Sequence, residues 1–163
     1  MVLSYAVMRA LTFAALVIAA CSGDTRQSRA AHESKPYEEE LQLCVDLVNQ
    51  YRATVRRSPL KRSEALEAFA AQAAANDGRA HVGHQYFQRT HGGGVSHAEN
   101  AIPWWPLASI DGGVRGALEQ GLQMMWDEGP SGGHYRNMVG RYSEIGCGIF
   151  LSHGEVTIVA EFR

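Results

Sequence analysis

The chain has 163 residues, of which 45% are hydrophobic and 20% are charged, and this is the composition of an ordinary globular protein. Its length suffices for one domain with a single hydrophobic core. A formal net charge of −2 is too small to indicate a nucleic-acid-binding protein, so no nucleic-acid partner is expected.

The first residues predict an export signal followed by a lipid anchor. Residues 10–20 are apolar except for Thr12, and this run is too short to span a bilayer but typical of a signal-peptide core. Small residues lead directly into Cys21. This arrangement resembles the lipobox of bacterial lipoproteins, in which cleavage precedes a lipidated cysteine. We predict a signal peptide over residues 1–20, with a start at Met1 or Met8, and lipidation of Cys21. The alternative is an ordinary signal peptide with an incidental cysteine.

Residues 21–36 are predicted to be a disordered tether between the lipid and a folded domain, because they are largely polar. Ser22 rather than an aspartate follows the cysteine, and this resembles the outer-membrane sorting pattern of Gram-negative lipoproteins. The expected location of the exported protein is therefore the bacterial outer membrane or cell surface, with the membrane bound through Cys21.

Two amphipathic helices are predicted at the start of the domain. Apolar residues recur at three- and four-residue steps over residues 37–55, and Pro59 ends this element. Ser63 is placed to cap a second helix that extends to about residue 76, where Asp77 and Gly78 form a stop signal.

The rest of the domain combines an irregular stretch with one more helix and a hairpin. Residues 79–109 show the least regular pattern, and Asp111 is expected to cap the third helix. A short helical turn is expected from His134, and residues 145–150 and 155–162 alternate as two strands. Helices beside a terminal antiparallel hairpin indicate the α+β class.

Acidic and histidine residues occur in four short motifs in the last forty percent of the chain. They are Ala98-Glu99-Asn100, Trp126-Asp127-Glu128, Gly133-His134-Tyr135-Arg136-Asn137-Met138 and Gly146-Cys147-Gly148. With their order and spacing, residues 40–163 resemble the CAP superfamily of cysteine-rich secretory proteins, antigen 5 and pathogenesis-related protein 1. The resemblance implies a CAP/SCP-like domain over residues 37–163, folded as an α-β-α sandwich with helices on both faces of a small antiparallel sheet.

The resemblance also implies a cavity formed by two glutamates and two histidines. In the family, the motifs Gly-Glu-Asn, Trp-x-x-Glu and Gly-His-Tyr supply three of them, and the matching residues are Glu99, Glu128 and His134. The match departs from the family at Ala98, which replaces a glycine, and in the second motif, which is one residue shorter. Asp127 therefore competes with Glu128, which we favour because it preserves the run into Gly-His-Tyr.

The fourth cavity residue is an upstream histidine whose distance from the first glutamate varies in the family. His84 precedes an aromatic pair that can anchor it in the core, and it is the preferred choice. His91 is nearer to Glu99 but is followed by three glycines. His97 is two residues from Glu99, so it would share its face of an extended strand. These two remain alternatives.

Two imidazoles and two carboxylates are a donor set suited to a divalent cation such as zinc, with water completing the shell. The same groups suit a metal-free hydrogen-bonded network. Neither arrangement supplies a nucleophile, so the catalytic residues are unknown, with the cavity residues as candidates: His84, Glu99, Glu128 and His134. Residues 129–133 match Gly-x-Ser-x-Gly but follow a helix, so Ser131 is predicted to be a loop residue.

Three further features lie outside these motifs. Cys44 and Cys147 are predicted to form a disulfide, because lipidation of Cys21 leaves an even pair in an oxidising setting; two buried free thiols are the alternative. Trp104 and Trp105 are predicted to pack rather than to line a ligand groove. A basic cluster is interpreted as a solvated face rather than a lipid-headgroup site. It comprises Arg52, Arg56, Arg57, Lys61 and Arg62.

Together these features predict an envelope-anchored CAP-domain lipoprotein that acts as a binding module. The resemblance implies a lipid or sterol-like ligand, a divalent cation or a partner protein for the Glu/His cavity. The second hypothesis is a metal-dependent hydrolase, specifically a peptidase, with a glutamate as base and the ion as Lewis acid. The third is a structural module of the envelope. The oligomeric state has no signature in the sequence.

Overall fold

A four-stranded sheet forms the centre of residues 35–163, the part of the chain that the computed structural model describes. The predicted signal peptide, Cys21 and the tether up to residue 34 lie outside the described residues. The strand order is β1-β3-β4-β2, with β1 (Lys61–Arg62) parallel to β3 (Glu144–Ser152). Strand β4 (Glu155–Phe162) runs antiparallel to both β3 and β2 (Ala98–Pro106).

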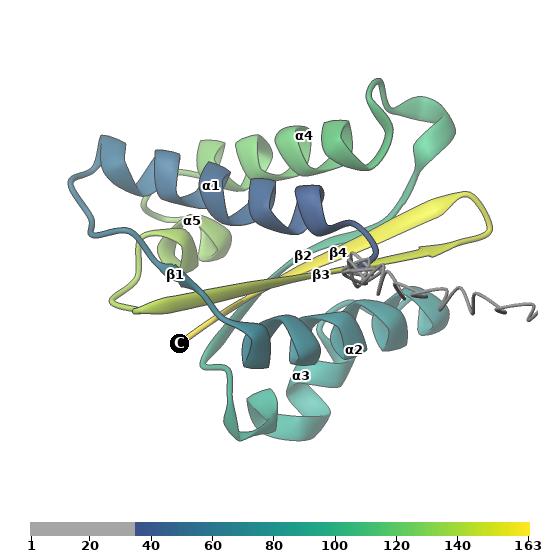
Figure 1. Ribbon diagram of the computed structural model, residues 1–163, viewed down its shortest axis with the longest axis horizontal. Coiled ribbons are helices and arrows are strands. Elements are labelled where there is room, and N and C mark those ends of the chain that lie inside the picture. The colour runs from purple at the N-terminus through teal and green to yellow at the C-terminus, as the bar shows by residue number, and fades with distance from the viewer. Residues whose placement is uncertain (1–34) are drawn as a thin grey trace, which may run out of the picture. The chain divides into compact units, whose positions relative to one another are not determined.

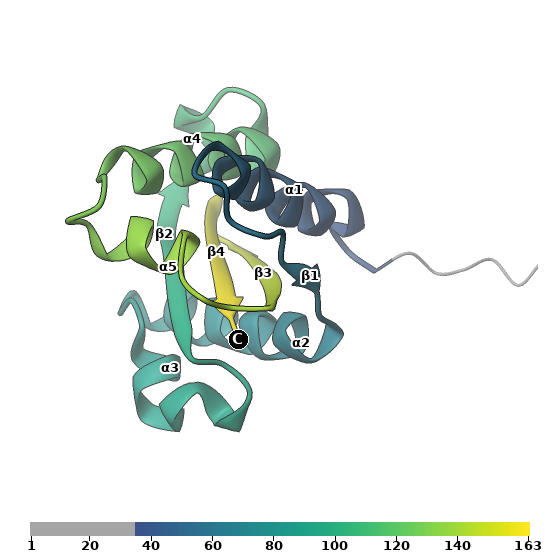
Figure 2. The same cartoon turned by 90° about the vertical axis from the view of Figure 1, so that its left-hand side faces the viewer.

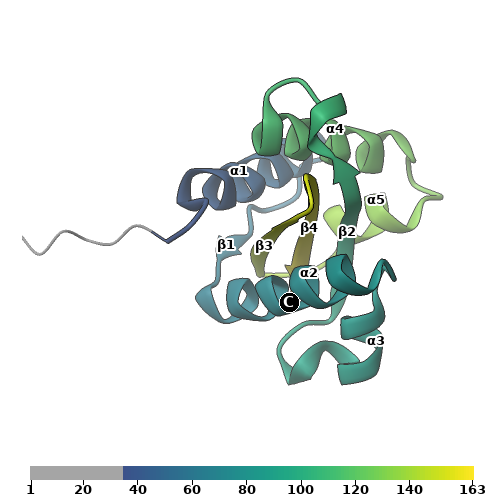
Figure 3. The ribbon, with the colours of Figure 1, turned by 90° about the vertical axis from the view of Figure 1, so that its right-hand side faces the viewer.

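Helices cover both faces of this sheet (Figure 1). One layer contains α1 (Glu38–Thr54), α4 (Gly113–Asp127) and α5 (Gly133–Met138). The other contains α2 (Glu64–Ala80) and α3 (Gln85–Thr90), and 3₁₀ turns η1 (His91–Gly94) and η2 (Leu107–Ser109) flank β2. The three layers confirm the predicted α-β-α sandwich, and they are seen end-on in Figures 2 and 3.

The larger part of the core lies between the sheet and the layer of α1 and α4. Its fully buried members include Leu118, Leu122, Ile145 and Phe162. A smaller cluster on the opposite face packs Ala70, Ala73 and Ala74 of α2 against Val159 of β4. These small alanine side chains allow α2 to lie close to the sheet, in contact with strand β3.

The Gly146-Cys147-Gly148 motif has a structural explanation in the alternation of side chains along β3. A Cβ atom at Gly146 would lie 2.3 Å from the backbone nitrogen of Glu67, and one at Gly148 would lie 2.2 Å from the carbonyl carbon of Ala70, so neither position has room for a side chain. Cys147 points to the other face and forms a disulfide with Cys44 of α1, with Cα atoms 6.5 Å apart. The predicted disulfide is confirmed.

The predicted stop at Asp77-Gly78 is wrong, because α2 continues to Ala80. A Cβ atom at Gly78 would lie 2.7 Å from Oγ1 of Thr157 and 2.8 Å from Cδ1 of Phe150, so this glycine permits close packing on the sheet. Asp77 is buried and accepts a hydrogen bond from the backbone of Tyr86. Both residues therefore serve packing rather than helix termination.

The stretch predicted to be irregular contains α3 and the strand β2, which the sequence pattern did not reveal. Pro103 and Pro106 disguise the strand, but β2 is at the edge of the sheet, where proline is tolerated. The pairing with β4 also shifts between Ile102 and Trp105. Asp111 does not cap α4, which begins after Gly112 without a side-chain cap.

The interpretation of the basic cluster as a solvated face is wrong for two of its members. Arg52 is only 2% exposed, and Arg62 forms ion pairs with Glu38 and Glu67. The other three members, Arg56, Arg57 and Lys61, are exposed. Trp105 packs against the core and Trp104 is half-buried, as expected for packing residues.

No helix within residues 35–163 is both long enough and apolar enough to cross a membrane.

Candidate functional site

The first half of the site is a buried glutamate that holds a histidine. Glu99 follows the first residue of β2, and its side chain is 1% exposed. Its Oε1 lies 2.7 Å from Nδ1 of His84, which immediately precedes α3. His84 has a φ of 63°, a left-handed conformation that costs about 1–2 kcal/mol for a residue other than glycine. The surrounding structure therefore holds this histidine in a strained position beside Glu99.

The second half is a histidine–glutamate pair at the surface. Glu128 directly follows α4, and its Oε1 lies 2.5 Å from Nδ1 of His134 in the first turn of α5. The backbone N–H of His134 also donates to Oε2 of Glu128, at 3.1 Å. The side chains are 34% and 33% exposed. A Cβ atom at Gly132 would lie 2.2 Å from Cβ of Glu128, so the glycine-rich loop is what lets the two groups meet.

The two halves are joined by a pair of asparagines. Asn100 donates a hydrogen bond to the carbonyl of His134, and Asn137 donates to the carbonyl of Glu99 and to Oδ1 of Asn100. These bonds tie α5 to β2, and the two imidazole rings lie with centroids 6.4 Å apart at an interplanar angle of 27°. Both asparagines belong to the sequence motifs, but the motifs alone gave them no role.

The structure thus brings together His84, Glu99, Glu128 and His134, and it separates the alternatives from them. The Asp127 side chain accepts a hydrogen bond from Gln123 on the exposed face of α4. His91 is exposed, and His97 lines a pocket with Arg163 instead. Ser131 is an exposed loop residue, as predicted.

A second buried acid, which sequence reasoning missed, lies beside Glu99. Glu161 of β4 is directly opposite Glu99 in the ladder and is fully buried. Burial and the neighbouring Glu99 carboxylate raise the pKa of Glu161 to about 9, so it is protonated at neutral pH. Its Oε2 accepts from Ser96 at 2.6 Å. The hydrogen bond between the two carboxyl groups is a further cause of this raised pKa, so the protonated Glu161 is the partner of Glu99 in the buried pair.

The hydrogen bonds within the two pairs also shift the pKa values of His84 and Glu128. The hydrogen bond to Glu99 raises the pKa of His84, although partial burial opposes it. The hydrogen bond from His134 lowers the pKa of Glu128. At neutral pH, Glu128 is therefore an ionised acceptor, poorly suited to removing a proton as a general base.

Both imidazoles use Nδ1 to contact a carboxylate, and this determines what the site can bind. When Nδ1 carries the proton, Nε2 of a neutral ring presents a lone pair, which is the carboxylate–histidine arrangement that supports metal ligands in proteins. Within residues 35–163, no three His, Cys, Asp or Glu side chains are arranged to hold a metal ion. The predicted set of four ligands is therefore reduced to two imidazole nitrogens, with the glutamates as their supports.

Comparisons with known proteins identify solved structures with a similar fold. An outer surface protein from Borrelia burgdorferi is 14% identical and superimposes with a TM-score of 0.55, over 77% of this chain and 92% of that one. NaASP2, whose crystal structure was determined with Zn²⁺, is 15% identical with a TM-score of 0.56, over 74% and 77%. No curated protein sequence matches the chain. The profile of the CAP family, described as the cysteine-rich secretory protein family, matches residues 45–160, and the chain therefore belongs to the CAP family.

Proposed function

We propose that the protein is an extracytoplasmic binding module, anchored to the bacterial envelope through Cys21, that binds a divalent transition-metal ion through Nε2 of His84 and His134. The observation that carries this proposal is the shared geometry of the two rings. Each is oriented by a carboxylate at Nδ1, and the two lie 6.4 Å apart on different elements of the fold.

The donor set suits zinc. Neutral imidazole is its common nitrogen ligand, and two such ligands leave positions for water or for a group of a binding partner. When bound, the ion would supply Lewis-acid attraction for that group. Glu99 and Glu128 then act on the imidazoles, by fixing the ring orientation and the tautomer.

A binding role fits these residues better than hydrolysis. A hydrolase would need a carboxylate that is free to accept a proton near the ion. Glu99 is buried between His84 and the protonated Glu161, whereas Glu128 is held in its ionised form by His134. Both carboxylates are thus already engaged in holding the histidines.

A lipid-like ligand has a candidate site away from the histidines. An apolar pocket of about 370 Å³ lies between the start of α1, α2 and β3, and Leu41, Ala68 and Ile149 are among the residues that line it. It shares no lining residue with the His84–His134 pair. The metal proposal therefore does not depend on whether this pocket is filled.

The test is a calorimetric zinc titration of the purified chain and three variants. His84 and His91 both have left-handed backbones, with φ of 63° and 52°, and asparagine tolerates this conformation. His84→Asn and His134→Ala should each weaken zinc binding by at least about a hundredfold, since each removes a ligand. His91→Asn is the matched control and should bind as the wild type does. Equal zinc affinity in the wild type and both site variants would refute the proposal.

A further inference from the structure

A buried arginine without an acidic partner marks a second site, at the carboxyl-terminal end of α1. Arg52 lies in the last turn of α1 and is 2% exposed. Its Nε donates to the carbonyl of Ser58, and its Nη1 donates to the carbonyls of Met138 and Gly140. All three acceptors are neutral, and within the described residues no carboxylate lies within ion-pair distance of Arg52.

A buried charge without a counter-charge is unfavourable, because its desolvation is only partly offset by dipoles. The three carbonyls occupy Nε and Nη1 of Arg52, whereas its Nη2 has no hydrogen-bond partner among residues 35–163. Burial and the neighbouring Arg57 both lower the pKa of the Arg52 guanidinium, because both make its positive charge less favourable.

Two more arginines add to this charge. Arg57 donates its backbone N–H to the carbonyl of Arg52, which places it directly beside the buried group. Arg57 and Arg141 are both exposed, and neither is paired with a carboxylate in the described part of the chain. Arg163 is nearby, but its guanidinium pairs with Glu144, so its charge is compensated.

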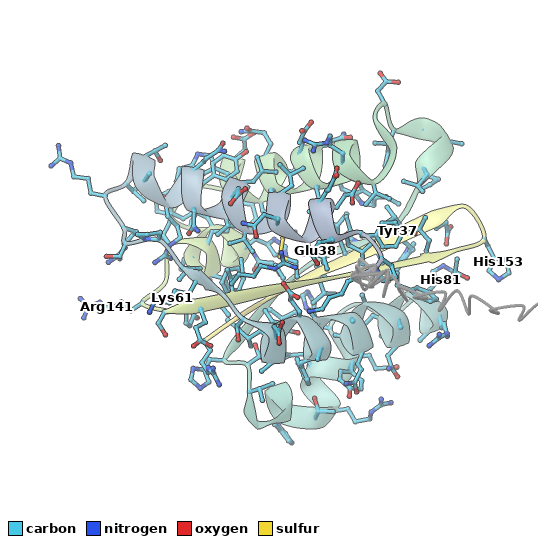
Figure 4. The ribbon with its side chains drawn as sticks, in the orientation of Figure 1. Tyr37, Glu38, Lys61, His81, Arg141 and His153 are labelled. Carbon is cyan, nitrogen blue, oxygen red and sulfur yellow. A yellow bond between two sulfur atoms is a disulfide. The ribbon has the colours of Figure 1, made fainter. Side chains whose placement is uncertain are left out.

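These groups line one pocket of about 490 Å³, to which Arg52, Arg57 and Arg141 contribute three guanidinium groups that form no ion pair within the described residues. The pocket also exposes Ser58, Tyr142 and Ser143 to a ligand. Figure 4 places Arg141 at the end of the sheet away from His153, and Figure 1 places the carboxyl end of the chain at that same end. No residue of the His84–His134 pair lines it.

We infer that this pocket is a binding site for a phosphate group, held by the guanidinium groups of Arg57 and Arg141 over the buried charge of Arg52. A phosphate monoester carries close to two negative charges at neutral pH, and it offers several oxygen acceptors to planar guanidinium donors. A single carboxylate would leave most of the positive charge uncompensated. Free phosphate and the phosphomonoester headgroup of phosphatidic acid present this same chemistry.

The inference is independent of the metal proposal, and its test uses the purified full chain. Inorganic phosphate is titrated calorimetrically at constant ionic strength, with chloride as the balancing anion. The double variant Arg57→Gln/Arg141→Gln removes the two exposed arginines and leaves Arg52 in place, because its carbonyl bonds support the fold. The control Arg79→Gln/Arg89→Gln removes two exposed arginines from α2 and α3 and changes the net charge by the same amount.

We expect the double variant to bind phosphate at least tenfold more weakly than the wild type, and the control to stay within twofold. A second arm measures the extra binding to phosphatidic acid/phosphatidylcholine vesicles over phosphatidylcholine vesicles alone, which subtracts the contribution of a lipid anchor. If only this extra binding is present and is lost in the double variant, the source is a lipid headgroup. No binding in either arm, or an equal loss in the control, would overturn the inference.

Discussion

The two histidine–glutamate pairs have the same hydrogen bond, but their carboxylates have opposite surroundings. In the pair His84–Glu99 the carboxylate is 1% exposed and belongs to a strand of the central sheet. In the pair His134–Glu128 both side chains are about one-third exposed, and the carboxylate is at the end of a helix before a glycine-rich loop. One half of the site is thus fixed by the core, and the other is assembled at the surface.

This difference separates two requirements of a binding site. The pair with the buried carboxylate, which we call the buried pair, is held by the sheet, by the protonated Glu161 and by the bond from Asn137, so it fixes the position of one imidazole. Both imidazoles remain accessible to a ligand, since the side chains of His84 and His134 are 39% and 33% exposed. The comparison predicts that changes in the buried pair affect folding strongly, whereas changes in the exposed pair affect binding with little effect on folding.

The largest effect expected from this comparison is on stability. Glu99→Ala leaves a cavity and removes the acceptor of the Glu161 proton, and it should lower the free energy of unfolding by about 2–3 kcal/mol. Glu128→Ala removes a solvent-screened pair and should cost less than about 1 kcal/mol. Urea denaturation of both variants measures the difference. Equal losses would show that the two halves do not differ as the burial indicates.

The pH dependence of stability should reveal the protonated acid behind the buried pair. Folding raises the pKa of Glu161 from about 4.5 to about 9, so the folded state binds more protons than the unfolded state between these values. The contribution of Glu161 to stability is therefore complete below about pH 4.5 and decreases as the pH rises towards 9. Glu161→Gln cannot titrate and should flatten this decrease. Unfolding midpoints of the two proteins from pH 5 to 9 would show parallel curves if Glu161 were ionised in the fold.

A smaller effect is expected from the loop that supports the exposed pair. Gly132 has an ordinary φ of −76°, so alanine introduces no backbone strain there, but its Cβ would overlap Glu128. Gly132→Ala should displace Glu128 from His134 and weaken zinc binding about tenfold, as expected for loss of a supporting carboxylate. Gly133→Ala is the matched control, because nothing lies within 4 Å of its Cβ position. Calorimetry that finds the same zinc affinity in both variants would show that Glu128 does not support His134.

The smallest change is in the pKa of the histidine that is paired with the buried Glu99. The hydrogen bond to the Glu99 carboxylate is the main cause of the raised pKa of His84. Glu99→Gln keeps the shape of the side chain but removes the charge, so the pKa of His84 should decrease. NMR titration of the imidazole resonances measures it, with Glu128→Gln as the control that should leave His84 unchanged.

Much of the site could be predicted from the sequence, because its residues lie in short motifs with local constraints. Glu99, Glu128 and His134 were predicted because their motifs resemble those of CAP proteins, and His84 was preferred as the fourth residue because of the aromatic residues that follow it. Glu161 could not be found in this way. Its role depends on pairing with Glu99 across the ladder between β2 and β4, far along the sequence, and β2 itself was hidden by two prolines.

The prediction of the fold from the sequence was limited in the same way, because distant contacts leave no local pattern. The helices of the first layer and the terminal hairpin were predicted because their patterns are local, and the resemblance to CAP proteins supplied the layers. Gly78 was mistaken for a helix end because its reason lies in Phe150 and Thr157, on strands more than seventy residues away. Arg52 was assigned to a solvated cluster because the carbonyls that surround it include two from a distant segment, at Met138 and Gly140.

The central claim, that two imidazoles bind a divalent ion through Nε2 while their Nδ1 atoms stay bonded to carboxylates, is tested most directly by nitrogen NMR. Long-range proton–nitrogen correlation spectra of the chain, which has seven histidines, are recorded as zinc is added. The account predicts that the Nε2 signals of His84 and His134 shift together up to one equivalent, while their Nδ1 signals remain those of a protonated nitrogen. Zinc-dependent shifts at Nδ1 of these residues, or only at other histidines, would contradict it.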